Sequence, residues 1–166
     1  AGFPTDLISW WDCEEATGAT RLDCYGTNHL LDIGTDDVLR GTGIVNFGTD
    51  FVPNGVSSGY LQIVDNASLS LGAGVSMSIC AWVLTDENAE LSDIYLVGKN
   101  HVVGEWSLVL RGGGAASRFR FQVVGTTGAT NEVVANTFGA VPVGTWSFVV
   151  AIHDATTDVL KISVNN

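Results

Sequence analysis

The sequence predicts an all-β fold, an antiparallel β-sandwich or jelly roll. Helical periodicity is almost absent along the 166 residues, and apolar residues alternate with polar ones instead. Clusters of Gly, Thr, Asn and Asp separate these alternating runs at nearly regular spacing, and 20 glycines supply the positive φ angles that such turns need. Many short strands between regular turns are typical of two stacked antiparallel sheets.

The first extended segment is expected in "LISWWDCEE" at positions 7–15. Successive side chains of an extended chain point to opposite faces, so Trp10 and Trp11 cannot enter the same core. One indole must be buried, and the other must find a covering loop of its own domain, a partner or a sugar. The residues alone leave these three alternatives open.

The middle and C-terminal parts of the chain carry the clearest strand patterns. We expect strands at 60–64, 77–84, 94–98, 106–110, 118–123, 146–152 and 160–164. In 77–84 residues of both parities are apolar, which predicts a strand in the middle of a sheet that is covered on both faces. In 146–152 the residues Trp146, Phe148, Val150 and Ile152 line one face.

Length and composition predict one domain over residues 1–166, with a full-sized core. Hydrophobic residues make up 46% and charged residues 15%, which is too apolar for a disordered chain, and no apolar run approaches the roughly 20 residues of a membrane span. The net charge of −11 repels phosphate backbones, so we expect no nucleic-acid partner. The acidity either keeps the surface soluble or supplies carboxylates to a hard cation such as Ca²⁺.

The chain has three cysteines, which cannot all pair with one another. Cys13 and Cys24 are close in sequence, and a disulfide between them across a short hairpin would suit an oxidising compartment. Cys80 lies inside an apolar strand and is interpreted as a small buried hydrophobe.

Several blocks, read in order, resemble the laminin G-like branch of the concanavalin A-like lectin/glucanase superfamily. The resemblance runs through nearly the whole chain, in "LISWWDCEEATGATRLDCYG", "GYLQIVDNASLSL", "SMSICAWVLTDE", "YLVGKN", "WSLVLRGG", "FRFQVVG" and "VPVGTWSFVVAIHDATTDVLKISVNN". The most specific block is the strand that ends in Ala-Trp-Val. The resemblance implies a concanavalin A-like jelly roll in which Trp11 is the core residue and Trp10 faces outward.

The end of the sequence departs from the family pattern. In the family that this chain resembles, the sequence normally continues past the strand that corresponds to "KISVNN", and one or two further strands return beside the opening segment. This sequence stops at Asn166. The domain is therefore expected to lack its usual last strand or strands. Either more sequence follows, or another molecule supplies the edge by strand addition beside residues 7–13.

The resemblance also implies calcium, because laminin G-like domains often bind Ca²⁺ at the rim of the sandwich. The candidate ligands are Asp12, Glu14, Asp23 and Asn28, near the first hairpin. The alternative is that these are solvated turn residues that accept local hydrogen bonds.

No catalytic residue is assigned. Glycosidases of the superfamily carry a Glu-x-Asp-x-x-Glu pattern along one strand, whereas "WDCEE" lacks the first Glu and "TDENAELSD" is interpreted as a loop. His29, His101 and His153 fall in separate segments without metal or triad spacing.

The sequence therefore predicts a non-catalytic interaction or structural module of an extracellular or particle-surface assembly, such as a virion decoration or fibre component or a bacterial surface structure. Its partners are expected to be other protein subunits and its partner surface to include Ile8, Trp10, Tyr60 and Trp106. The first alternative is a calcium-assisted carbohydrate-binding module that uses an exposed aromatic such as Trp10, Tyr60 or Trp106. The second, which the missing carboxylate pattern disfavours, is a glycoside hydrolase.

Overall fold

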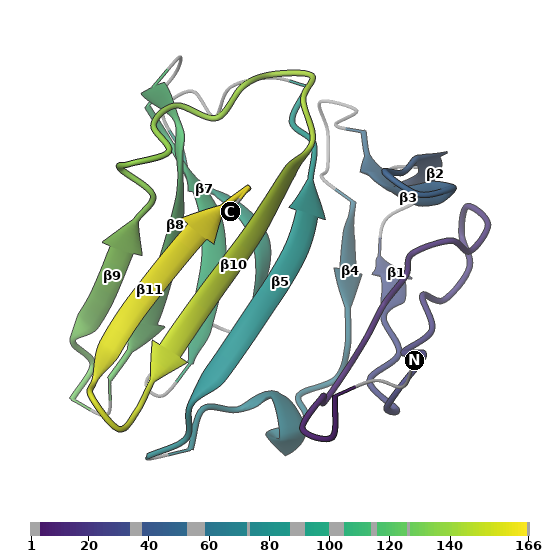
Figure 1. Cartoon of the computed structure of the whole chain (residues 1–166). Coiled ribbons are helices and arrows are strands. Elements are labelled where there is room, and N and C mark those ends of the chain that lie inside the picture. The colour runs from purple at the N-terminus through teal and green to yellow at the C-terminus, as the bar shows by residue number, and fades with distance from the viewer. Residues whose placement is uncertain are drawn as a thin grey trace. The chain divides into compact units, whose positions relative to one another are not determined.

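The computed structural model describes residues 4–33, 38–52, 59–72, 74–86, 92–99, 105–113, 116–125 and 127–165. The chain divides into two compact units, Ala1–Leu69 and Ser70–Asn166, and each is described by itself. Every strand pair is antiparallel. The predicted all-β, antiparallel architecture is confirmed (Figure 1).

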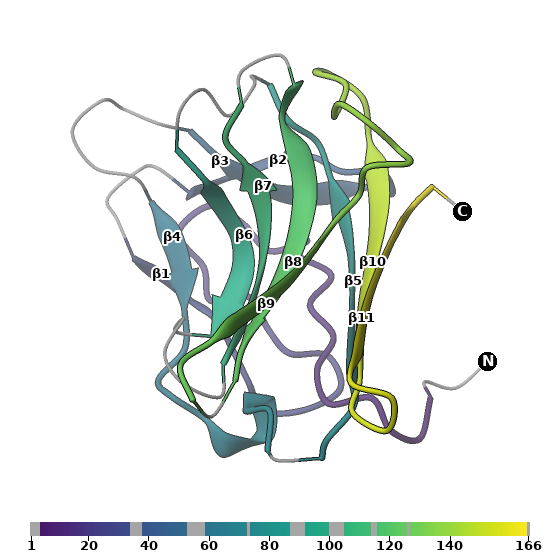
Figure 2. The same ribbon diagram turned by 90° about the vertical axis from the view of Figure 1, so that its left-hand side faces the viewer.

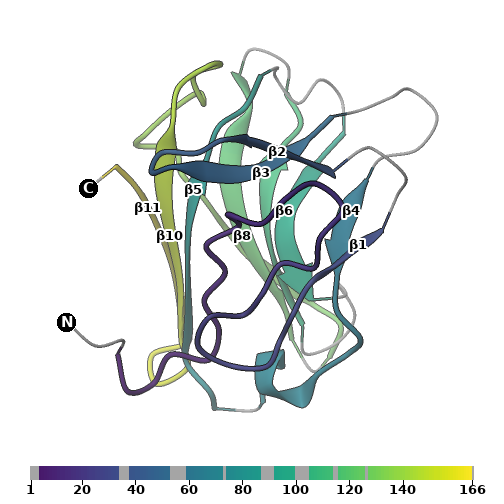
Figure 3. The same cartoon turned by 90° about the vertical axis from the view of Figure 1, so that its right-hand side faces the viewer.

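The first unit contains two separate strand pairs among long irregular segments (Figure 3). One pair joins β1 (Leu31–Ile33) to β4 (Tyr60–Gln62), and the other joins β2 (Val38–Thr42) to β3 (Phe47–Phe51). A 3-10 turn, η1 (Ala67–Leu69), closes the unit. Residues 7–13 run as an extended segment outside these sheets, which we call the N-terminal ribbon.

The β2–β3 hairpin includes the glycine- and threonine-rich stretch "GTGIVNFGTD" at 41–50, one of the clusters that the sequence analysis interprets as turns. Gly41 and Gly48 lie opposite each other in the two strands, so the glycines that suggest a turn are paired strand residues here. The actual turn is short: the Gly43 N–H donates to the Asn46 carbonyl at 3.2 Å, and Asn46 has a φ of 54°. Asn tolerates this left-handed conformation better than other residues with a side chain.

The second unit is a sandwich of two antiparallel sheets (Figures 1 and 2). The three-stranded sheet has the order β11-β10-β5, with β5 at Met77–Val83, β10 at Ser147–Asp154 and β11 at Val159–Val164. The four-stranded sheet has the order β6-β7-β8-β9, with strands at Ile94–Lys99, Trp106–Arg111, Arg118–Val124 and Thr130–Val134.

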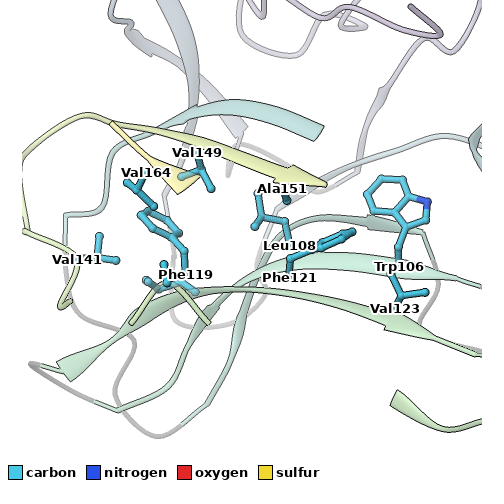
Figure 4. Close-up of a cluster of buried hydrophobic side chains, with 11 residues drawn as sticks. Trp106, Leu108, Phe119, Phe121, Val123, Val141, Val149, Ala151 and Val164 are labelled. Atoms are coloured by element: carbon cyan, nitrogen blue, oxygen red, sulfur yellow. The ribbon is translucent and has the colours of Figure 1, made fainter. Parts of the chain in front are cut away.

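The core of this unit lies between the two sheets (Figure 4). Alternation along β8 turns Phe119 and Phe121 inward, and both are fully buried. Leu108 and Leu110 of β7 lie beside them, and smaller side chains of the opposite sheet, such as Val149, complete the cluster. Large aromatic rings packed against small residues fill the space between the two sheets.

The core shows which face of β10 is buried, and it corrects two expectations about β5. The inward residues of β10 are Val149 and Ala151, both fully buried, whereas Phe148 on the opposite face is only half-buried. In β5 the side chain of Trp82 remains 49% exposed and that of Cys80 is also exposed, so this strand is not covered on both faces and Cys80 is not a buried hydrophobe. Parity decides which residues face the core, and apolar character alone does not.

Candidate functional site

The first unit is organised around a buried carboxylate, Asp23. Its Oδ1 accepts the main-chain N–H groups of Trp10 at 3.0 Å, Tyr25 at 3.1 Å and Gly26 at 2.8 Å, and its Oδ2 accepts that of Asn28 at 3.0 Å. Burial raises the pKa of a carboxyl group, but the four donors, with Gly26 first, more than offset this and lower the pKa of Asp23 to about 2. The carboxylate therefore fixes the loop 23–28 against the N-terminal ribbon.

Asn28 is a second buried hub beside it. Its side-chain Nδ2 donates to Ser9 Oγ at 2.7 Å and Ser68 Oγ at 3.1 Å, and its Oδ1 accepts from Asn66 Nδ2 at 2.7 Å. Its main-chain carbonyl accepts the indole N–H of Trp11 at 2.6 Å. One amide thus ties the N-terminal ribbon to Asn66 and to Ser68 of η1.

The other two candidate calcium ligands are also engaged in local contacts. Asp12 Oδ1 accepts the main-chain N–H of Glu14 at 3.3 Å, and Asp12 Oδ2 lies 3.6 Å from the Cys24 thiol. Glu14 Oε1 accepts from Asn46 Nδ2 at 3.0 Å. These are the turn contacts that the sequence allowed as the alternative to metal ligation.

The residues present do not fit a calcium ion shared by Asp12, Glu14, Asp23 and Asn28. The oxygens of Asp23 already accept four N–H groups, and the amide of Asn28 is saturated by neighbours, so neither offers lone pairs to a cation that needs six to eight oxygens. Among the residues that the structure describes, no three His, Cys, Asp or Glu side chains gather as a metal-binding group. We assign no calcium to this cluster.

All three cysteines are free thiols in the structure, and burial raises the pKa of each. Cys24 is exposed and its thiol contacts Asp12, while Cys13 is half-buried with a φ of 59°. The Cys13–Cys24 disulfide is absent here and stays a prediction for an oxidising compartment.

Two of the histidines named in the sequence lie in the described residues, and each has a local contact. His29 Nδ1 accepts the main-chain N–H of Asp23 at 2.9 Å, and His153 lies in β10, where its Nδ1 is 3.2 Å from the Val75 carbonyl. His101 and residues 87–91 of the acidic segment lie outside the described residues.

The predicted partner residues have different surroundings. Ile8 is 50%, Trp10 46% and Tyr60 50% exposed, whereas Trp11 is half-buried and held by Asn28. Trp106 is a correction: it opens β7 on the face between the sheets and is 6% exposed, in the core cluster. A buried indole cannot serve as a docking surface.

The N-terminal ribbon is bound along one edge. The N–H of Trp10 donates to Asp23 Oδ1, its carbonyl accepts from the Cys24 N–H at 2.7 Å, and the carbonyl of Ile8 lies against Gly26. The N–H and C=O groups of an extended chain alternate between its two edges, so those of Ser9 and Trp11 point the other way. Within the described part of the chain, no main-chain hydrogen bond reaches Ser9 or Trp11.

A partly exposed aromatic pair on the second unit was not singled out from the sequence. Trp82 and Phe148 are direct partners on β5 and β10, and their rings lie 5.0 Å apart on the face away from the core. The apolar residues on both faces of the segment 77–84 could have indicated this aromatic pair from the sequence.

Comparison with known proteins identifies a family. A laminin G family model, described as the concanavalin A-like lectin/glucanases superfamily, matches residues 54–166. The match leaves out the first 53 residues, which hold the N-terminal ribbon and both buried hubs. Searches of curated proteins and of solved structures each found no match.

Domains of this kind are β-sandwich modules that often bind proteins or carbohydrates; they are typically non-catalytic and commonly extracellular, although the superfamily includes glycoside hydrolases. Many folds of the superfamily bind Ca²⁺. The described residues include no helix with the length and apolarity of a membrane span. The match covers more than half of the chain, and the two-sheet sandwich of the second unit agrees with the fold of this family. The chain therefore belongs to the laminin G-like family of the concanavalin A-like lectin/glucanases superfamily.

Proposed function

We propose that this chain is a non-catalytic interaction module of an extracellular or particle-surface assembly, such as a virion or a bacterial surface structure, and that a second protein subunit binds it by strand addition beside residues 7–13. The observation that carries the proposal is the free edge of the N-terminal ribbon, where the main-chain groups of Ser9 and Trp11 have no main-chain partner in the described part of the chain. An exposed row of main-chain donors and acceptors is a template for another strand.

The side chains of the ribbon suit this mode of binding. Ile8 and Trp10 share one face and are half exposed, so an added strand can cover them while it pairs with the edge. In strand addition the main-chain hydrogen bonds supply affinity and the alternate side chains supply specificity. The contacts of Asp23 and Asn28 hold the ribbon in place before the partner arrives, which lowers the ordering cost of binding.

Hydrogen exchange tests the pairing directly. We expect the amide hydrogens of Ser9 and Trp11 to exchange rapidly in the isolated chain and to become protected at least tenfold when the chain sits in its native assembly, because paired amides exchange only when the strand opens. Equal exchange rates in the two states would show that no strand binds there.

A matched pair of variants separates the edge from the side chain. Ser9→Pro removes the edge N–H together with the hydroxyl, whereas Ser9→Ala removes only the hydroxyl that accepts from Asn28. We expect Ser9→Pro to lose incorporation into the assembly and Ser9→Ala to keep it. Incorporation of both variants at the wild-type level would contradict strand addition.

The second candidate is carbohydrate binding through an exposed aromatic face, and the half-exposed ring of Tyr60 favours it. Trp106 is excluded from this role by its burial. A glycan array with the wild type and Tyr60→Ala tests the idea, and glycan binding that the substitution removes is the expected result. A wild type that binds no glycan on the array would dispose of it.

A further inference from the structure

The second unit concentrates positive charge on one sheet face, in a chain that is otherwise strongly acidic. The chain has seven Lys and Arg residues against 18 Asp and Glu, yet three arginines lie together on β7 and β8. Arg111 and Arg118 are direct cross-strand partners, and Arg120 follows two positions along β8, so all three side chains share the face opposite to Phe119 and Phe121. We call these three residues the arginine face.

Arg120 is neutralised within the protein. It forms ion pairs with Asp93 and, at 3.3 Å, with Glu132 of β9. Asp93 also accepts the main-chain N–H of Gly112 at 3.0 Å, which holds that carboxylate at the start of the loop after β7. Two carboxylates therefore serve one guanidinium.

Arg111 and Arg118 have no such partners. In the part of the chain that the structure describes, neither forms an ion pair, and Nε of Arg118 is buried without a hydrogen-bond acceptor. Like charges directly opposite each other in a sheet are destabilising, and a buried donor without an acceptor costs more.

The two arginines line a cavity. It has a volume of about 280 Å³ and is bordered by Arg111, Gly112, Ala116, Arg118 and Val134. Gly112 and Ala116 are small lining residues, and Val134 supplies an apolar part of the lining. The cavity thus presents two guanidinium groups that form no ion pair within the described residues, and the Asp93 carboxylate at the Gly112 N–H is engaged by Arg120. Its volume is at the lower end of the size range of small-molecule sites.

We propose that this cavity binds the carboxylate of a small organic acid of about the size of one sugar ring, such as a uronic acid. A guanidinium presents two parallel N–H donors that match the two oxygens of a carboxylate, and a ligand carboxylate removes the repulsion between the two arginines. The net charge of −11 repels a polyanion but opposes a single negative charge far less, so the ligand carries one carboxylate rather than a chain of sulfates or phosphates.

Calorimetric titration with glucuronate, glucose and inorganic phosphate tests the site. We expect millimolar or tighter binding of glucuronate to the wild type, no binding of glucose, and weakening as NaCl is added. No glucuronate binding at about 10 mM, or binding of phosphate in preference to glucuronate, would overturn the proposal. An acidic peptide that binds where glucuronate does not would assign the face to a protein partner instead, and would overturn it too.

Matched charge variants locate the site. Arg111→Gln and Arg118→Gln are each expected to weaken glucuronate binding at least about tenfold, because each removes a charge-assisted hydrogen bond. Lys161→Gln, which removes one positive charge from an exposed position of β11, is expected to bind like the wild type. Equal affinity of all three variants would contradict the assignment.

Folding and the strand-addition proposal are controlled separately. Arg111 is exposed, and its replacement relieves repulsion, so Arg111→Gln is expected to unfold at the same temperature as the wild type or higher while it loses the ligand. Ser9→Pro changes only the N-terminal ribbon and is expected to bind glucuronate normally. The two proposals can therefore fail independently.

Discussion

At the scale of single residues, Asp23 and Asn28 show how two polar side chains organise a segment that has little regular structure. Both were expected to be calcium ligands because oxygen-bearing residues near a hairpin are what a hard cation prefers. The sequence shows that both residues carry oxygen atoms, but it does not show which groups bind them. The donors to Asp23 are main-chain N–H groups, which a pattern of side chains cannot predict. They belong to Trp10, Tyr25, Gly26 and Asn28. Main-chain N–H groups, rather than a cation, neutralise the carboxylate of Asp23 in this structure.

The pKa of Asp23 makes stability depend on pH. A carboxyl whose pKa is lower in the folded state stabilises the fold above its unfolded pKa of 3.8, and that stabilisation is lost as the pH falls toward about 2. We expect a loss of about 1–2 kcal/mol in the free energy of unfolding over this range, after an allowance for solvent screening. Urea denaturation between pH 5 and pH 2 measures it.

Asp23→Asn is the corresponding variant, with Asp6→Asn at an exposed position as its control. Asp23→Asn is expected to be destabilised at pH 7 and to lose part of the acid dependence, whereas Asp6→Asn keeps both. An acid dependence that is unchanged in Asp23→Asn would show that other carboxyl groups cause it.

Gly26 is required by close contact. A Cβ at this position would lie 2.6 Å from the carbonyl oxygen of Ile8 and 2.6 Å from Oδ2 of Asp23. We expect Gly26→Ala to lower the free energy of unfolding by about 1–3 kcal/mol, because the ribbon must move away from the loop. Gly48→Ala, whose nearest neighbour would be 3.5 Å away, is the control for thermal denaturation and should change little. Similar losses in both variants would refute the contact argument.

At the scale of elements, alternation predicted most strands of the second unit but did not always predict the face that is buried. The expected strands at 94–98, 106–110, 118–123 and 160–164 correspond to β6, β7, β8 and β11. In β10 the larger side chains were on one parity, yet the core takes Val149 and Ala151 because the aromatic rings of β8 already fill the space opposite. The size of the residues on the facing sheet decides which face of β10 is buried, and the sequence of β10 alone does not contain that information.

Two phenylalanines test which face is the core. Phe121 is fully buried between the sheets, while Phe148 is half-buried beside Trp82 on the other face of its sheet. We expect Phe121→Ala to cost about 3–5 kcal/mol in the free energy of unfolding, and Phe148→Ala less than half as much. Chemical denaturation compares the two variants. A larger loss for Phe148→Ala would mean that the sheet is covered on its outer face.

At the scale of the whole molecule, the sequence predicted the family, but the number of folding units is a separate question. The structure divides at residue 69, whereas the family match runs from residue 54 to 166 and crosses that division. The resemblance of the first 53 residues stays a prediction, because the match does not include them. Composition gives the net charge of −11 but does not reveal that Arg111, Arg118 and Arg120 share one sheet face.

A single domain should unfold in one step. We expect scanning calorimetry of the chain to show one transition whose calorimetric and van't Hoff enthalpies agree. Two separated transitions, one of which survives deletion of the first 53 residues, would show instead that the units fold independently. Because Gly26→Ala affects only the first unit, its effect on the transition tells the two outcomes apart.

The hub at Asn28 has a consequence for the order of folding. Its amide joins residues 19 positions before it and 40 positions after it in the chain, so its hydrogen bonds form only after a long loop has closed. The hairpins of the second unit bring near neighbours together and face a much smaller entropic barrier. We therefore expect the ribbon edge that a partner strand would meet to form later than these hairpins.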